Sequence, residues 1–119
     1  MTTATWNRLK GLMGLCVRAR QAVFGEDGCL KTIRAGSCGV ILVDEGASQA
    51  TKEKYRGACL HAGVTVAWLP EGLLYDATGR PGVAMAVPKG GLAEQLKGLL
   101  SAENTASEEA NHSGGASVE

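Results

Sequence analysis

The sequence contains few of the residues from which metal and catalytic sites are usually built. Among its 119 residues are only two histidines, and none of its four cysteines forms a Cys-x-x-Cys pair. Because zinc sites in small domains use such closely spaced ligands, we expect no metal and no other cofactor. The cysteines lie in apolar or helical contexts, which predicts small buried core residues: Cys16, Cys29, Cys38 and Cys59.

Long apolar runs and phosphate-binding loops are also missing. No apolar stretch approaches the roughly 18 residues that a membrane-spanning helix needs. The first residues, Met-Thr-Thr-Ala-Thr-Trp, are polar and do not resemble a signal peptide. The glycines at 79, 82, 90 and 91 do not fit the Gly-x-x-x-x-Gly-Lys-Ser/Thr pattern of a phosphate loop. We therefore expect a cytoplasmic protein with no membrane partner.

Aromatic residues make up only 4% of the chain, although 45% of the residues are hydrophobic. A core must therefore be built from Leu, Val, Ile, Ala and Met, and a chain of this length supports one domain. The segment 103–119 contains a single Val and otherwise Ser, Ala, Glu, Asn and Gly among its commonest residues. We expect one folded domain over 1–102 and a disordered acidic tail over 103–119.

The formal net charge of zero hides an uneven distribution of charge. Four of the twelve acidic residues lie in 103–119, which has no Lys or Arg, so residues 1–102 carry an excess of four positive charges. The first 34 residues contain six basic residues and only two acidic ones, Glu26 and Asp27. Such a concentration favours an anionic partner, although a basic cluster alone is also typical of a solvated helix face.

Hydrophobic periodicity predicts helices that alternate with short apolar strands. Ser48 is expected to cap the third helix, Gly36 and Gly63 to end the second and third, and Pro70 to open the short fourth helix. This alternation predicts an α/β protein, a three-layer α-β-α sandwich around a mixed, largely parallel sheet of about four strands. The expected helices are 5–20, 27–35, 48–62, about 70–78 and 91–101, and the expected strands are 21–24, 39–44, 64–69 and 83–87.

The segment around the start of the second helix combines cations, acids and a glycine turn. Gly25 permits a tight turn, and Glu26 and Asp27 suit the positive end of the helix dipole. Lys31 and Arg34 lie one helical turn apart and can both reach phosphates, with Arg18 and Arg20 contributed by the preceding helix. A helix N-terminus of this kind can bind a phosphate backbone and read base edges at one place.

Simpler interpretations of the same residues remain open. The stretch Gly25–Gly28 is also typical of an ordinary strand-to-helix turn, and its cations of a solvated helix face. Asp44 and Glu45 end a predicted strand, where acid–base chemistry or a metal could be placed. No His, Ser or Cys is positioned to complete such a site, so a strand-end turn is favoured, and we expect no enzymatic activity.

Several segments, taken in order, carry a resemblance to a known family. They are Leu15-x-x-Arg18-Ala19, Gly25-Glu26-Asp27, Lys31-x-Ile33-Arg34-x-Gly36, Val40 to Ser48 followed by Thr51-Lys52-x-Lys54, Val64-Thr65-Val66, and Leu74-x-x-Ala77-x-Gly79-Arg80. In order and spacing they resemble the ribosomal protein L-seven-Ae / L-thirty-e superfamily, and most closely its small bacterial YlxQ-type members. The resemblance covers about residues 8–100.

The resemblance implies a non-enzymatic, ribosome-associated protein that binds kink-turn or similar structured RNA. It places the RNA contacts at the Gly25 turn with the start of the second helix, and at the loop that contains Thr78, Gly79 and Arg80. Ribosomal or RNA-processing proteins are the implied protein partners. The family's recognition pattern is Gly-x-Asn-Glu-x-x-Lys, and this chain reads Gly25-Glu26-Asp27-Gly28-Cys29-Leu30-Lys31.

Two positions depart from that pattern, since Asp27 replaces Asn and Gly28 replaces Glu. An ionised Asp only accepts hydrogen bonds, so Asp27 can take guanine N1–H or N2–H but cannot donate to a purine N7. The departures support an alternative function as a protein–protein adaptor on the same fold with a degenerate RNA site. A small-ligand binder or enzyme is disfavoured by the missing phosphate loop and the missing nucleophile–base pair.

Overall fold

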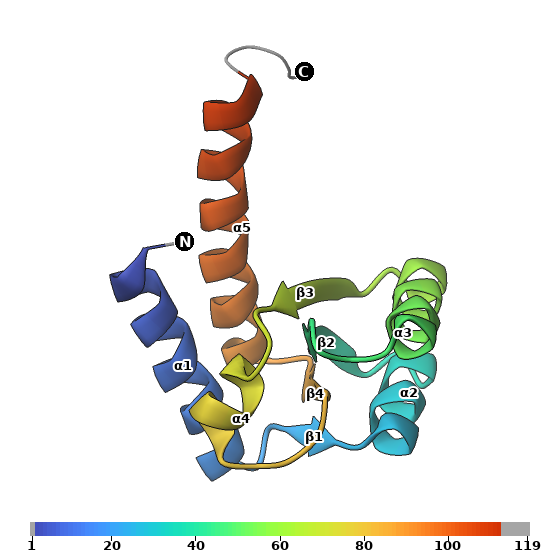
Figure 1. Cartoon of the computed structure of the whole chain (residues 1–119). Helices are drawn as coiled ribbons and strands as arrows, with labels where there is room; N and C mark the ends of the chain where they lie inside the picture. Colours follow the sequence, from blue (N-terminus) through green and yellow to red (C-terminus); the bar gives the residue numbers. More distant parts are fainter. Residues whose placement is uncertain (1, 113–119) are drawn as a thin grey trace.

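A four-stranded sheet lies between two layers of helices (Figure 1). The computed structural model describes the backbone of residues 2–112 and the side chains of residues 2–101. The predicted α-β-α sandwich with a mixed four-stranded sheet is confirmed. Within the described residues the helices are α1 (Thr3–Arg18), α2 (Glu26–Arg34), α3 (Gln49–Ala62), α4 (Leu73–Thr78) and α5 (Gly91–His112), and the strands are β1 (Val23–Phe24), β2 (Cys38–Asp44), β3 (Thr65–Leu69) and β4 (Ala84–Pro88).

The strand directions differ from the largely parallel sheet that the sequence predicts. The strand order is β1-β4-β2-β3, and only β2 and β3 are parallel, whereas β4 runs antiparallel to both β1 and β2. The cause is the length of α4. Its six residues span about 9 Å, whereas the seven residues of β2 span about 23 Å. So short a helix cannot return the chain to the other end of the sheet, and β4 starts where β2 and β3 finish.

Each face of the sheet has its own apolar core. Helices α1, α4 and α5 cover one face and α2 and α3 the other, on the left and right of Figure 1. Along β2, Val40 and Leu42 point to the first face, while Ile41 and Val43 point to the second. All seven residues of β2 are buried, as its continuous apolar run predicts. The four cysteines are free thiols in these cores, so their prediction as buried residues is confirmed.

Several predicted helix ends are confirmed. Ser48 caps α3, since its hydroxyl oxygen accepts a hydrogen bond from Thr51 N–H at 3.1 Å. Gly63 and Gly36 both have the left-handed conformation expected after a helix end, with φ of 71° and 75°. The start of α4 is wrong in the prediction, because the helix begins at Leu73 and not at Pro70.

The cause of this difference is a buried carboxylate. Asp44 accepts hydrogen bonds from Gly46 N–H at 2.6 Å and from Gly72 N–H at 2.9 Å. The second bond, with Gly72 at φ 88°, holds the chain after β3 in a turn until α4 begins. Asp44 is only 7% exposed, and its bond to Gly72 fastens the end of β2 to the segment that follows β3. The prediction of a strand-end turn at this position agrees with the structure.

The last helix, α5, continues to His112 and so passes the predicted end near residue 101. Extending an existing helix needs no new nucleation, and Ala and Glu, frequent after residue 102, favour it. Part of the stretch expected to be disordered therefore has helical backbone, while residues 113–119 of that stretch lie outside the described residues. The division of the chain at residue 102 stays a prediction.

Candidate nucleic-acid interface

The turn before α2 has a backbone conformation that favours glycine. Gly25 precedes the helix at φ 88° and ψ 144°, and its carbonyl accepts the first helical hydrogen bond, from Cys29 N–H at 3.0 Å. The amides of Glu26, Asp27 and Gly28 in the first turn have no acceptor within the helix. Gly25, Glu26 and Asp27 are exposed, so these donors and two carboxylates are presented together at the surface.

The two acids of this turn have different surroundings. Glu26 forms an ion pair with Lys54 of α3 at 2.6 Å, which ties the two helices together. Asp27 forms no ion pair with any described side chain. It lines a shallow hollow of about 530 Å³ together with Lys31 and Arg34. The α2 surface therefore offers one unpaired carboxylate beside two cations.

The structure gives a reason for glycine at position 28 that the sequence alone did not reveal. A Cβ atom at this position would lie 3.0 Å from Val23 Cγ1, which is tighter than ordinary contact. The neighbouring thiol of Cys29 donates a hydrogen bond to the Val23 carbonyl at 3.3 Å. The short strand β1 is thus pressed against the first turn of α2, and a side chain at residue 28 would push it away.

The structure brings the second predicted contact segment close to this turn. Strand β1 pairs with β4 through Phe24 and Met85, and the Arg80 guanidinium lies over the Phe24 ring at 4.4 Å from its centroid. Thr78 fixes the loop by donating to the Leu74 carbonyl at 2.8 Å and accepting from Arg80 N–H at 3.1 Å. Phe24, which directly precedes Gly25, was missed in the sequence, where it was interpreted as a strand residue only.

Arg18 is the last residue of α1, and Arg20 lies in the connection from α1 to β1. A Cβ added to Gly14 would lie 3.3 Å from Arg18 Nη1 and 3.6 Å from the Ala77 carbonyl, so Arg18 lies beside the end of α4. Arg20 has φ 60°, the left-handed conformation that costs a non-glycine residue roughly 1–2 kcal/mol. Both side chains are exposed.

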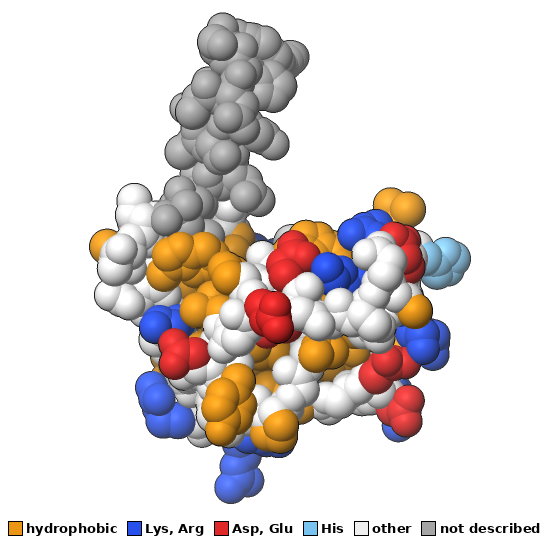
Figure 2. All heavy atoms as spheres, in the orientation of Figure 1, with side chains coloured by type: hydrophobic (Ala, Val, Ile, Leu, Met, Phe, Trp, Pro, Cys, Tyr) orange, Lys and Arg blue, Asp and Glu red, His pale blue; other side chains and the backbone are white. Residues whose placement is uncertain are grey.

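The cations of the predicted site share one property. None of them forms an ion pair with a described side chain. We call them the unpaired cations: Arg18, Arg20, Lys31, Arg34 and Arg80. Five of the seven other cations have carboxylate partners, and these are Lys10, Lys52, Lys54, Arg56 and Lys97. Figure 2 shows Lys and Arg side chains along the lower margin, whereas on the side of α3 basic and acidic side chains alternate.

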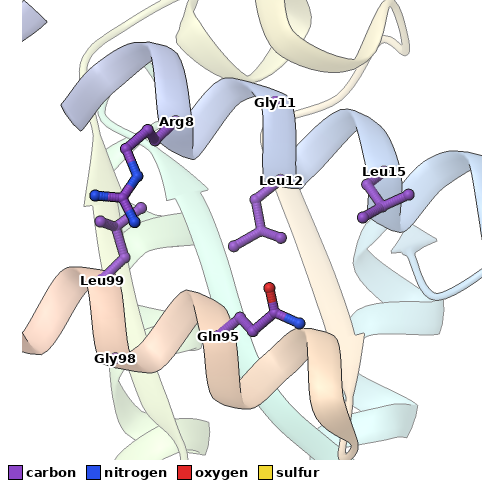
Figure 3. Close-up of a pocket in the computed structure, with 7 residues that line it drawn as sticks. All are labelled: Arg8, Gly11, Leu12, Leu15, Gln95, Gly98 and Leu99. Carbon is purple, nitrogen blue, oxygen red and sulfur yellow. The ribbon is translucent and has the colours of Figure 1, made fainter. Parts of the chain in front are cut away.

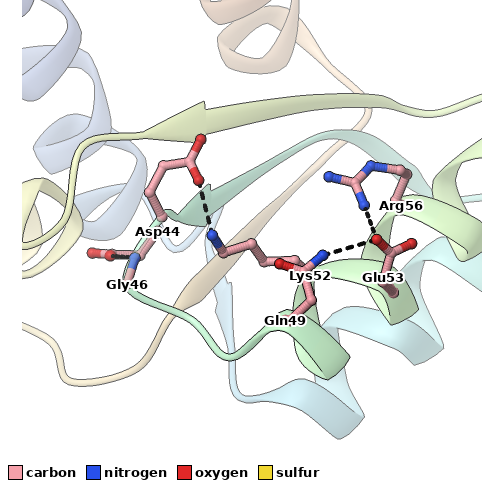
Figure 4. Close-up of polar contacts among 7 residues, drawn as sticks. Asp44, Gly46, Gln49, Lys52, Glu53 and Arg56 are labelled. Carbon is pink, nitrogen blue, oxygen red and sulfur yellow. Dashed lines mark hydrogen bonds and ion pairs between the residues drawn. The ribbon is translucent and has the colours of Figure 1, made fainter.

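The contacts of α3 illustrate the paired arrangement (Figure 4). Lys52 binds Glu45 at 3.1 Å, and Arg56 binds Glu53 at 2.7 Å. Arg56 also lies over the Trp68 ring, 4.9 Å from its centroid. The carboxylates of Asp44 and Glu45, which might have suggested acid–base chemistry, are therefore engaged with backbone amides and a lysine, respectively.

The titratable groups beneath α2 are protected from water. Burial raises the pKa of the Cys38 and Cys59 thiols to about 11, with nearby Cys59 and Cys29 adding to the effect at Cys38. Burial also raises the pKa of Tyr55, and its hydroxyl is buried without a hydrogen-bond partner. Thiols with raised pKa values are poor nucleophiles, so this layer has the properties of a core.

A second hollow, between α1 and α5, has a different lining. Figure 3 shows Leu12, Leu15 and Leu99 around this groove of about 580 Å³, with Arg8 and Gln95 at its border. No cation cluster lines it. Within the described residues no group of three or more His, Cys, Asp or Glu residues could hold a metal ion, and no helix is long and apolar enough to cross a membrane.

The chain is similar to solved structures of other proteins. No protein-family model matches the chain, and no curated protein matches its sequence. A Bacillus halodurans protein of unknown function has a TM-score of 0.74 and 26% identity, over 79% of this chain and 97% of that one. A 15.5 kD RNA-binding protein of Giardia lamblia has a TM-score of 0.68 and 15% identity, over 86% and 92% of the two chains.

An archaeal translation termination factor also shares this architecture, with a TM-score of 0.54 and 16% identity. The match covers 73% of this chain but only 26% of the factor, so the fold forms one part of that larger protein. Order of elements, sheet topology and these likenesses agree with one another. The chain therefore has the L-seven-Ae type of fold that the sequence resemblance implied.

Proposed function

We propose that this protein is a non-enzymatic RNA-binding domain that recognises structured RNA at the start of α2. The observation that carries the proposal is the position of the unpaired cations. They lie at and after the end of α1, along α2 and in the loop after α4, while five of the seven other cations are neutralised by carboxylates. Two proteins with the same fold, an RNA-binding protein and a translation termination factor, support the same class of partner.

Each part of the interface has a chemical role in this proposal. Lys31 and Arg34 bind phosphates, and so do Arg18 and Arg20. The first-turn amides and the carboxylate of Asp27 face bases, because a carboxylate would repel the phosphate backbone. Arg80 lies flat on Phe24 and offers its outer guanidinium face for stacking by an unpaired base.

The finer proposal is that the RNA is a kink-turn or a related element, in the ribosome or another cytoplasmic RNA, as expected for a YlxQ-type protein. Such elements present splayed bases whose edges are accessible, and a helix N-terminus can read them. Asp27 accepts two hydrogen bonds from N1–H and N2–H of one guanine, so it selects an edge rich in donors. With Gly28 in place of Glu, the other carboxylate of this turn is that of Glu26, which is paired with Lys54.

Titration of the purified protein with a kink-turn RNA and a plain duplex, each over a range of salt concentrations, tests the proposal. Tighter, salt-sensitive binding to the kink-turn is the expected result. Equal weak binding to both RNAs would remove the kink-turn specificity but keep general RNA binding. Absence of binding to either RNA at low salt would overturn the proposal and favour a protein adaptor on the same fold.

A further inference from the structure

Lys89 is an exposed cation that the resemblance does not include in the interface. It lies in the connection from β4 to α5, and its N–H donates a hydrogen bond to the Ser37 carbonyl at 2.9 Å. Ser37 follows α2 directly after Arg34, Ala35 and Gly36. Lys89 is thereby fastened to the end of the helix whose start carries the proposed base-reading turn.

The close approach of the two segments is fixed by Gly39. A Cβ atom at this position would lie 2.6 Å from the Ala93 Cβ and 3.2 Å from the Lys89 Cα. Only glycine lets β2 pass this close to the β4–α5 connection without a shift in backbone. The place of Lys89 relative to Arg34 is therefore set by packing and by a backbone hydrogen bond.

Arg20 approaches the same end of the sheet from another direction. Strand β1 is antiparallel to β4, with Val23 opposite Ala86, so the chain that enters β1 runs beside the chain that leaves β4. The left-handed conformation of Arg20 is held by hydrogen bonds from Arg20 N–H to Val17 at 3.1 Å and from Gln21 N–H to Cys16 at 2.7 Å. Three separate segments thus bring a cation to the end of the sheet where β4 finishes.

The segments that build this end of the molecule are 18–25, 35–43 and 84–93, and they contain no Asp or Glu, although Glu26, Asp44 and Glu94 directly follow them. Glu26 is paired with Lys54 and Glu94 with Lys97, while Asp44 accepts hydrogen bonds from backbone amides. Among the described side chains, Arg20, Arg34 and Lys89 form no ion pair.

We infer that Lys89 joins Arg20 and Arg34 to extend the proposed interface past the end of α2, where the three cations hold a duplex arm of the RNA whose bases are read at Gly25. The inference rests on the proposed function. The nine residues of α2 separate the two ends by about 14 Å, so contacts at both ends require an RNA that continues past the recognised bases. Three cations that form no ion pair with any described side chain can supply sequence-independent binding of a phosphate backbone.

The test compares wild-type protein and Lys89→Ala on three RNAs: a kink-turn with two full duplex arms, and two versions in which one or the other arm is shortened. Lys89→Ala is expected to weaken binding to the full RNA severalfold and to reduce the salt slope by about one. The same loss is expected for one shortened RNA and no loss for the other, because only one arm reaches Lys89. The variant keeps the backbone hydrogen bond to Ser37, so its fold should be unchanged.

Lys97→Ala is the matched control, since Lys97 is a nearby lysine already paired with Glu94. It should bind all three RNAs like the wild type. Equal affinity and equal salt slope for Lys89→Ala and wild type on the full RNA would overturn the inference while leaving the proposed function intact. A loss that is the same on all three RNAs would also overturn it, because no arm would then be identified. Failure of the wild type to bind any of the RNAs would instead reject the proposed function.

Discussion

The cations on α2 and those on α3 differ in what they contact, although the helices lie side by side on one face of the sheet. On α3, Lys52, Lys54 and Arg56 each bind a carboxylate within 3.1 Å. On α2, Lys31 and Arg34 have no such partner among the described side chains. Exposed ion pairs contribute only about 0–1 kcal/mol each to stability, but they cancel the local field. The arrangement of carboxylates, more than the number of cations, therefore decides where an anion is attracted.

Reversing charge on the two helices should give the largest contrast. Lys31→Glu with Arg34→Glu removes two phosphate contacts and adds repulsion, so RNA affinity should fall about 100-fold or more at low salt. Lys52→Glu with Arg56→Glu changes the net charge equally and should reduce affinity far less. Fluorescence anisotropy with a labelled kink-turn RNA measures both. Equal losses of affinity for the two double variants would show that only net charge matters. The difference between the cations of α2 and α3 would then have no bearing on RNA binding.

Glycine-to-alanine changes on the same two helices should move stability in opposite directions. Gly25→Ala forces a side chain into φ 88° and should cost about 1–3 kcal/mol. Gly57 lies inside α3 with nothing within 4 Å of an added Cβ, so Gly57→Ala should stabilise the protein by about 0.5–1 kcal/mol. Urea unfolding gives both values, and RNA affinity should fall for the first variant only. A neutral Gly25→Ala would contradict the described turn.

The two cation–aromatic contacts offer a finer comparison. Arg80 over Phe24 and Arg56 over Trp68 are both exposed, and each should contribute about 0.5–1 kcal/mol. Arg80→Ala and Arg56→Ala should therefore lower the unfolding free energy by similar small amounts. Only Arg80→Ala should also weaken RNA binding, because Arg56 lies on the α3 side. If Arg56→Ala weakens binding as strongly, the interface extends over α3.

A contrast in pH dependence concerns the apolar layer that α2 and α3 share. The Cys38 and Cys59 thiols have pKa values raised by burial from 9.0 to about 11, so the folded protein keeps both protonated where the unfolded chain ionises. This contribution to stability is complete below about pH 9 and is lost as the pH rises through 11. Unfolding free energies measured under reducing conditions should fall over this range, and less steeply for Cys38→Ala with Cys59→Ala. Identical slopes would indicate exposed thiols.

Most of the fold could be predicted from local signals in the sequence. The buried run of β2, the Ser48 cap and the glycines after α2 and α3 each act through neighbouring residues, and the structure agrees with them. The direction of β4 and the start of α4 could not be predicted. They depend on the length of a connection across the sheet and on the carboxylate of Asp44, which binds an amide 28 residues away.

The residues of the candidate site could be proposed from the sequence, but the contacts that each of them makes could not. Arg18, Arg20, Lys31 and Arg34 lie close to Gly25 along the chain, whereas Arg80 was implied by the resemblance alone. The sequence does not indicate that Lys54 neutralises Glu26, that Arg80 covers Phe24, or that Lys89 is fastened to the end of α2. These contacts join segments that are distant in the sequence. They determine which cations already have a partner in the folded protein and which can bind RNA.

The contact between Gly28 and Val23 also limits how this interface can evolve. The family pattern has Glu where this chain has Gly28, and a single substitution toward it would place a Cβ 3.0 Å from Val23 Cγ1. A side chain at position 28 therefore requires the Val23 side chain to give way by a few tenths of an ångström. The space around one methyl group thus influences which residues position 28 can accept.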